Sequence, residues 1–306
     1  MIEAIKTGRV IWHLVAILTM CIWGTTFIST KVLLQHGLSP ANIFFLRFVQ
    51  AYLGMLIISH RKWWCHRWQD ELQMFILGIC GGSLYFLTEN TALRYTLAGN
   101  VSLEVCTAPL ITALMASFVK KEHQGKRLWC GSIIALAGVS LIVVQSNATF
   151  HFNIVGDFLA ISAAILWSFY QLLTNPMTEK YGILFTTRKV FGYGILTILL
   201  YLMVTKSTIS TWQDFVNPFV WGNLLYLGIV ASLVCFLTWN QVMRRIGAVT
   251  SANYIYLNPV VTVCFSAIIL QEPITLATII GGAAIIGGVY MTQYQKNENK
   301  GIKNNK

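Results

Sequence analysis

Charged residues are scarce in this chain. Asp, Glu, Lys and Arg make up 11% of its 306 residues, whereas 56% are hydrophobic and the mean hydropathy is +0.62. A soluble domain needs a larger charged fraction to cover its surface. The composition therefore excludes an ordinary soluble fold and indicates a protein that lies in a lipid bilayer.

The motifs that support most catalytic chemistry are also lacking. The sequence contains no GxxxxGK(S/T) phosphate-binding loop and no HExxH metal motif. Its seven cysteines are an odd number without disulfide or metal-ligand spacing. We therefore expect no enzyme activity, no cofactor and no metal site. Any transport must draw its energy from a gradient rather than from nucleotide hydrolysis.

Long apolar runs fill most of the chain. A helix needs about 20 apolar residues to cross the hydrocarbon core of a bilayer. Ten runs of about that length follow one another with short polar breaks, at residues 10–33, 41–59, 72–93, 98–119, 127–145, 154–175, 183–204, 218–240, 247–270 and 274–293. The sequence thus predicts an all-α membrane protein with ten transmembrane helices.

The net charge of +11 could indicate a nucleic-acid-binding protein, but its distribution argues against one. If the N-terminus is cytoplasmic and the ten spans alternate, sixteen Lys and Arg residues fall in cytoplasmic segments, and only Arg94 and Lys206 fall outside. Membrane proteins carry such an excess of basic residues in their cytoplasmic loops. We therefore expect both termini in the cytoplasm and no nucleic-acid partner.

The chain contains an internal duplication. Residues 77–139 align without a gap on residues 227–289, an offset of 150. A weaker match extends to the earlier spans, where Trp23 meets Trp167 at an offset of 144 and Arg47 meets Arg188 at an offset of 141. The repeat unit is therefore five spans, residues 1–148 and 149–306.

An odd number of spans in each repeat has a topological consequence. The second copy must enter the membrane from the face opposite to the first, so the two five-helix repeats are inverted. Inverted repeats are typical of secondary transporters, whose substrate site lies near the midplane where the halves meet. The duplication thus favours a transporter that works by alternating access.

Several short motifs occur in a characteristic order. These are residues 23–27 with Lys31, residues 47–48, the stretch from Ala92 through Pro109 to Glu122, residues 156–160, residues 258–259 and residues 271–273. In order and spacing the chain resembles the EamA family of the drug/metabolite transporter superfamily over nearly its full length. The resemblance implies two five-helix domains in the inner membrane and transport of a small metabolite such as an amino acid.

Polar residues within the spans of the first half gather toward the outer side. Lys31, Arg47, Glu89, Asn90 and Glu104 are expected at similar depth. Such residues are costly in a membrane and usually face a cavity or a partner. They either tie helices together or line and gate the pathway. Among them, Lys31, Glu89 and Glu104 are the candidates for gating or for coupling to an ion such as a proton.

At the positions equivalent to these charges, the second half has mostly aromatic residues. Trp239 takes the place of Glu89, and Tyr254 that of Glu104, while Arg188 keeps the charge of Arg47. A pathway that is charged on one side and aromatic on the other favours an amphipathic substrate. The predicted substrate-binding residues are Trp23, Arg47, Glu89, Asn90, Glu104, Trp167, Tyr170, Arg188, Trp239, Asn240, Tyr254 and Asn258.

Proline and glycine mark two further features. Pro109 and Pro259 lie within spans, where each removes a backbone donor and either kinks the helix or exposes polar groups beside the pathway. Glycines in the fifth and tenth spans, Gly131, Gly138, Gly281, Gly282, Gly287 and Gly288, allow close helix contact. This contact is either within one chain or between two.

Two other classes of function remain open at this point. The chain could be an intramembrane enzyme acting on a lipid-linked group, although no nucleophile and base pair is evident, or a membrane scaffold that transports nothing. A transporter requires a polar cavity that reaches the midplane, whereas a scaffold fills that volume with side chains. The expected partners are a small-molecule substrate and the lipid bilayer, and the expected state is a monomer or weak homodimer.

Overall fold

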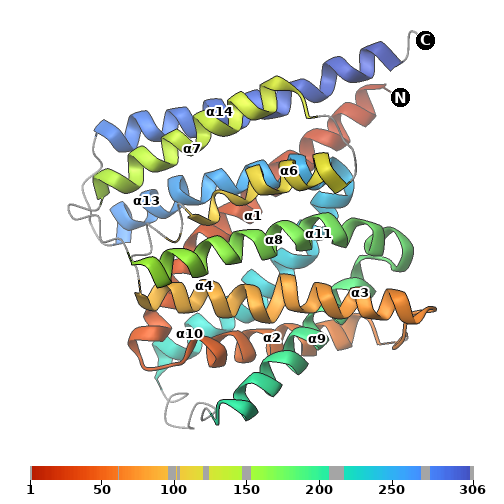
Figure 1. Cartoon of the computed structure of the whole chain (residues 1–306), viewed down its shortest axis with the longest axis vertical. Coiled ribbons are helices and arrows are strands. Elements are labelled where there is room, and N and C mark those ends of the chain that lie inside the picture. The colour runs from red at the N-terminus through yellow and green to blue at the C-terminus, as the bar shows by residue number, and fades with distance from the viewer. Residues whose placement is uncertain are drawn as a thin grey trace.

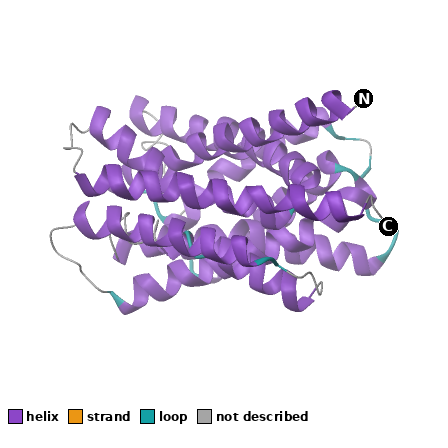
Figure 2. Ribbon diagram, turned by 90° about the horizontal axis from the view of Figure 1, so that it is seen from above, coloured by secondary structure: helices purple, strands orange, loops and turns teal. Residues whose placement is uncertain are grey.

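The computed structural model describes residues 2–60, 62–95, 101, 104–119, 124–146, 153–206, 217–269 and 276–303. These ranges are helical almost throughout, and the long helices lie roughly side by side in one bundle (Figures 1 and 2). The first helix begins and the last helix ends at the same end of the bundle, which we call the terminal end (Figure 1). Glu122 and residues 271–273 of the family motifs lie outside the described residues.

The first half of the chain supplies five successive helical segments. In chain order its elements are α1 (Ile2–Gln35), α2 (Pro40–Ile58), α3 (Trp68–Gly78), the π-helix η1 (Ile79–Ser83), α4 (Leu84–Tyr95), α6 (Ala108–Val119) and α7 (Lys126–Ser146). The elements α3, η1 and α4 follow one another without a break and form one span.

The second half repeats this order and has two additional short elements, α12 (Ala248–Ala252) and the 3-10 turn η4 (Asn253–Tyr256), among the described residues. Its elements are α8 (Ile154–Tyr181), α9 (Ile183–Val204), α10 (Pro218–Leu225), the π-helix η3 (Tyr226–Val234), α11 (Cys235–Ile246), α12, η4, α13 (Leu257–Ile269) and α14 (Leu276–Lys303). Each of the ten expected apolar runs thus corresponds to a helical segment among the described residues.

Six of these segments are long and apolar enough to cross a membrane. They are Val10–Gln35, Pro40–Ile58, Trp68–Tyr95, Ile154–Tyr181, Ile183–Val204 and Pro218–Ile246. Two shorter apolar helices are Ala108–Phe118 and Ile279–Thr292. The predicted class, an all-α membrane protein, is confirmed, while ten complete crossings stay a prediction.

Local sequence signals explain where several helices begin and end. Ser39 caps α2 by accepting a hydrogen bond from the backbone of Asn42, directly before Pro40 at the first helical position. Gly37 and Gly182 each follow the first helix of a half, and their φ angles of 91° and 86° lie in the region that favours glycine. A glycine with a positive φ angle therefore lies between the first two helices of each half, although four residues separate α1 from α2 and one separates α8 from α9.

Both halves also carry a π-helix at the same place. The five residues of η1 correspond, at the offset of 150, to residues 229–233 within η3. A π-helix holds an extra residue in a helical turn and is often found at functional sites. Within η1, Gly82 leaves helical geometry altogether, with φ −128° and ψ −109°. This shared irregularity lies in the third span of each half, next to the residues that face the centre of the bundle.

Close packing of α7 on α14 explains the glycines of the fifth and tenth spans. A Cβ atom added at Gly131 would lie 2.6 Å from the Gly288 carbonyl oxygen, and one added at Gly138 would lie 2.6 Å from that of Gly281. Contact within one chain therefore accounts for these four glycines. Gly282 and Gly287 instead face open space.

Two adjacent glycines of α14 test this contact. We expect Gly288→Ala to lower the free energy of unfolding by about 1–3 kcal/mol, because its Cβ would lie 2.5 Å from the Gly131 carbonyl oxygen. Gly287→Ala should instead leave stability equal or raise it by up to about 1 kcal/mol, because alanine is the better helix former and has room there. Thermal unfolding of the purified variants in detergent measures both. Equal midpoints for the two variants would contradict the packing argument.

Candidate functional site

A small cavity lies at the centre of the bundle, between helices of both halves. Its volume is about 40 Å³, which is room for a few water molecules. The residues that line it are Trp23, Thr26, Phe27, Arg47, Tyr85, Phe86, Glu89, Val105, Trp167, Phe236, Ile255 and Asn258. The cavity therefore combines an aromatic wall with two opposite charges and an amide.

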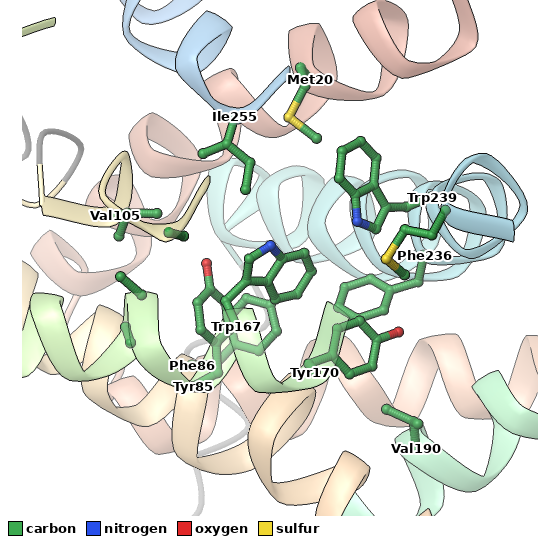
Figure 3. Packing of buried hydrophobic residues seen from close by; sticks show 14 of the residues in the cluster. Met20, Tyr85, Phe86, Val105, Trp167, Tyr170, Val190, Phe236, Trp239 and Ile255 are labelled. Atoms are coloured by element: carbon green, nitrogen blue, oxygen red, sulfur yellow. The ribbon is translucent and has the colours of Figure 1, made fainter. Parts of the chain in front are cut away.

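Aromatic rings from three helices form the floor of the cavity. The ring of Trp23 lies 5.5 Å from that of Trp167, 5.7 Å from Phe236 and 5.3 Å from Trp239, between centroids. Its indole N–H donates a hydrogen bond of 2.9 Å to the carbonyl oxygen of Ala231. Figure 3 shows Trp167 and Tyr170 of α8 converging with Phe236 and Trp239 of α11, and Tyr85 of α4 lies beside Trp167. Rigid aromatic walls of this kind suit the apolar part of a ligand.

The two charged side chains of the wall are buried and each has a polar neighbour. Arg47 donates from Nε to the Ser232 hydroxyl at 2.8 Å, and its guanidinium carbon lies 4.3 Å from the centre of the Phe86 ring. Glu89 accepts a 2.9 Å hydrogen bond from the Tyr85 hydroxyl. A buried cation and a buried anion on one wall stabilise each other, because each lowers the cost of burying the other.

Five of the predicted substrate-binding residues line the cavity. They are Trp23, Arg47, Glu89, Trp167 and Asn258. The amide oxygen of Asn258 is buried and has no hydrogen-bond partner among the described residues. This oxygen is therefore available to accept a hydrogen bond from a ligand or a water molecule in the cavity.

Three other predicted residues form a layer on the terminal-end side of the cavity. Tyr170 packs against Trp167 at 5.1 Å between ring centroids and donates a 2.9 Å hydrogen bond to the amide oxygen of Asn240. The amide nitrogen of Asn240 in turn donates to the Thr187 hydroxyl at 2.9 Å. Trp239 is fully buried beside Trp23. These residues adjoin the cavity without lining it.

The remaining predicted residues lie elsewhere. Asn90 donates to the Pro40 carbonyl oxygen at 3.4 Å, and Tyr254 contacts the ring nitrogen of His13 at 2.5 Å. Arg188 bonds the Ser59 carbonyl oxygen near the terminal end. These three make structural contacts between segments.

The charged residues that were expected toward the outer side of the first half do not all line the cavity. Lys31 and Glu104 are not among its lining residues, and Glu104 instead contacts the carboxyl of Asp157. The structure therefore does not bring these two residues together with Arg47 and Glu89. A gating or coupling role for Lys31 and Glu104 stays a prediction.

Seven lining residues were not among the predicted set. They are Thr26, Phe27, Tyr85, Phe86, Val105, Phe236 and Ile255. Helical spacing would have found some of them, because Thr26 and Phe27 lie one turn beyond Trp23, and Tyr85 lies one turn before Glu89. The others are apolar residues in apolar helices, so composition gives no signal for them. Within the described ranges no three His, Cys, Asp or Glu side chains converge as metal ligands.

The fold and this cavity define a multi-pass helical membrane protein with a central site of aromatic and charged residues. The profile of the EamA-like transporter family matches residues 10–144 and again residues 154–294, so the chain belongs to that family. It is thus a membrane transporter and not an enzyme.

Several relatives are similar over nearly their whole length. An uncharacterized transporter of Archaeoglobus fulgidus is 32% identical over 94% of this chain and 98% of its own. The uncharacterized transporter YdfC of Bacillus subtilis is 26% identical over 90% of this chain and 89% of its own. A probable terminal-alkyne amino-acid exporter of Streptantibioticus cattleyicolor is 24% identical over 94% of both chains. A solved crystal structure shares the fold, with a TM-score of 0.72, 19% identity and coverage of 95% of this chain and 98% of that chain.

The opposed charges of the wall predict a coupled loss of stability. We expect Arg47→Met to lower the free energy of unfolding by about 3 kcal/mol or more, because Glu89 would remain buried without an opposing charge. The double variant Arg47→Met with Glu89→Gln should be less destabilised than the sum of the two single variants, by about 1 kcal/mol or more. Thermal unfolding in detergent of all four proteins gives the coupling. Strictly additive losses would show that the two charges do not interact.

Proposed function

We propose that the chain is a secondary transporter that exports a small amphipathic metabolite, an amino acid or a close relative, by alternating access. The observation that carries the proposal is one buried cation and one buried anion set in an aromatic wall at the centre of a duplicated helical bundle. The family membership supports transport. The aromatic and charged lining of the cavity supports an amphipathic substrate.

The proposed architecture is two inverted five-helix halves, residues 1–148 and 149–306, in the cytoplasmic membrane with both termini inside. Three pairs of lining residues are equivalent in the duplication: Trp23 with Trp167, Phe86 with Phe236, and Val105 with Ile255. A pseudo-two-fold axis that relates the halves therefore passes through the cavity. A site on such an axis is equally reachable from both faces when the halves exchange shapes.

The chemistry of the wall matches a zwitterion with an apolar side chain. Arg47 offers a guanidinium to a carboxylate, and Glu89 offers a carboxylate to an ammonium group. The rings of Trp23, Trp167 and Phe236 supply the apolar surface, where aromatic faces also attract a cation. The relative that is described as an amino-acid exporter supports this class of substrate.

The size of the cavity fits a closed state. About 40 Å³ holds water and not an amino acid, so the substrate must widen the site when it binds. Widening requires α1 and α4 to move relative to α8 and α11, and this movement would link binding to a change of shape. Because the sequence has no phosphate-binding loop, a gradient supplies the energy, and Glu89 is the residue proposed to carry a coupled proton.

Reconstituted protein tests the function. In proteoliposomes, we expect counterflow of at least one of radiolabelled L-leucine, L-phenylalanine, L-glutamate and L-lysine above that of empty liposomes. Arg47→Gln should reduce the apparent affinity at least about tenfold, because a charge-assisted hydrogen bond to the substrate contributes about 1.5–3 kcal/mol. Glu89→Gln should retain exchange but lose acceleration by an imposed proton gradient.

The matched control is Lys206→Gln, which changes one exposed charge far from the cavity and should transport like the unmodified chain. A scaffold would give no saturable counterflow of any of the four probes. Equal affinities for Arg47→Gln and Lys206→Gln would exclude the proposed role of the cavity.

A further inference from the structure

Six lining residues have an equivalent in the other half that does not line the cavity, and one of them, Asn258, corresponds to Ala108. By the offsets of the duplication, Thr26, Phe27, Arg47, Tyr85 and Glu89 correspond to Tyr170, Gln171, Arg188, Cys235 and Trp239. Each of these five equivalents is buried in the structure. If the halves are inverted copies, these residues face the cavity in one half, whereas their equivalents in the other half are buried and do not reach it.

Unsatisfied polar atoms gather among these buried equivalents. Gln171 is fully buried with both its amide oxygen and its amide nitrogen lacking a partner among the described residues. The indole nitrogen of Trp239 and one terminal nitrogen of Arg188 also lack one. A buried polar group without a partner costs about 1–3 kcal/mol, so such groups need an explanation. Contact with water in a second conformation would supply one.

A chain of contacts runs from the central cavity to a second hollow at the surface. It passes through the residues that we call the buried layer, namely Tyr170, Gln171, Thr187, Arg188, Trp239 and Asn240. Trp167 packs on Tyr170, Tyr170 bonds Asn240, and Asn240 bonds Thr187, the neighbour of Arg188. Arg188 lies over the ring of Phe185 at 5.5 Å and bonds the Ser59 carbonyl oxygen.

Phe185 and Ser59 both line the surface hollow, whose volume is about 430 Å³. Its other lining residues are Ile58, His60, Lys62, Tyr181, Gly182, Ile183 and Leu184. The buried layer thus separates a central cavity from a wide opening at the terminal end.

Two ion pairs hold the halves together beside this opening. Lys189 of α9 pairs with Glu71 of α3, and both side chains are nearly buried, at 11% and 8% exposed. The hydroxyl of Tyr193 donates to Glu71 as well, and the backbone N–H of Cys65 donates to its other carboxylate oxygen at 2.8 Å. Every hydrogen-bond donor around this carboxylate therefore fixes the start of α3 against α9 or against the segment that precedes α3.

The second pair is more exposed. Asp70 accepts from Lys180 at 2.5 Å and from the Tyr181 hydroxyl at 2.6 Å, but the Lys180 side chain is 42% exposed. Exposed pairs contribute little to stability. The Glu71–Lys189 pair is therefore the stronger of the two contacts.

We propose that Glu71 and Lys189 form a latch that closes the terminal end of the transport pathway, and that Gln171, Arg188 and Trp239 line this end when the latch opens. The proposal rests on the transport function proposed above, because only an alternating pathway needs the layer to open. Arg188 then meets the anionic group of the substrate on this side, as Arg47 does in the central cavity.

Thiol accessibility tests the latch without requiring a known substrate. The Gln171→Cys variant, in membrane vesicles that expose the terminal end, is treated with a charged, membrane-impermeant maleimide. We expect slow labelling in an otherwise unmodified chain, and labelling at least about tenfold faster when Glu71→Gln or Lys189→Met is added. The same latch variants without Gln171→Cys give the background from the seven native cysteines.

Two matched controls separate opening from unfolding. Asp70→Asn weakens the exposed pair and should change labelling by less than about twofold. Ile198→Cys, which is buried on α9 away from the layer, should stay unlabelled in every background. Faster labelling at Ile198→Cys as well, or no acceleration at Gln171→Cys, would overturn the latch.

The outcomes also distinguish the latch from transport itself. Acceleration at Gln171→Cys in a protein that gives no counterflow would support the latch and reject the proposed substrates. If the protein gives counterflow but Gln171→Cys is labelled at the same rate with and without Glu71→Gln or Lys189→Met, transport is supported and the latch is rejected.

Discussion

The contact of Trp23 with Trp167, Phe236 and Trp239 joins the two halves at the centre of the bundle. Trp23 comes from the first half and its three partners from the second, and its indole N–H is bound to a carbonyl of η3. Because Trp23, Trp167 and Phe236 also line the cavity, the volume available to a ligand depends on how the halves pack. The shape of the cavity therefore depends on both halves.

Polar groups in the core are satisfied to different degrees on the two sides of this cluster. On the cavity side, Arg47 and Glu89 each have a hydrogen-bond partner and oppose one another in charge, whereas the amide oxygen of Asn258 has no partner among the described residues. On the terminal-end side, Gln171 and Trp239 are just as deeply buried but have polar atoms without partners among the described residues. A hydrocarbon environment makes such atoms expensive. The two sides thus differ in how well the present conformation satisfies them.

Sequence reasoning located the polar and aromatic parts of the site but could not complete it. Trp23, Arg47 and Glu89 stand out because each is unusual in an apolar span. Phe86 and Phe236 carry no such signal, because an apolar residue in an apolar helix reads as ordinary packing. Glu104 was grouped with Glu89 by its expected depth along a helix, but depth does not give the face of the helix, and Glu104 is not among the residues that line the cavity. Glu71 and Lys189 were missed because charges near helix ends are ordinary and their pairing joins residues far apart in the sequence.

A protein that alternates between two shapes needs them to be close in free energy, within a few kcal/mol. The Glu71–Lys189 pair and the Tyr170–Asn240–Thr187 hydrogen bonds favour the closed arrangement at the terminal end. Buried ion pairs contribute modestly after desolvation, and each unpartnered atom of Gln171, Trp239 and Arg188 costs about 1–3 kcal/mol. These two contributions act in opposite directions. In the alternating cycle that we propose, the unsatisfied groups thus offset part of the closing contacts and keep the closed shape from becoming too stable to leave.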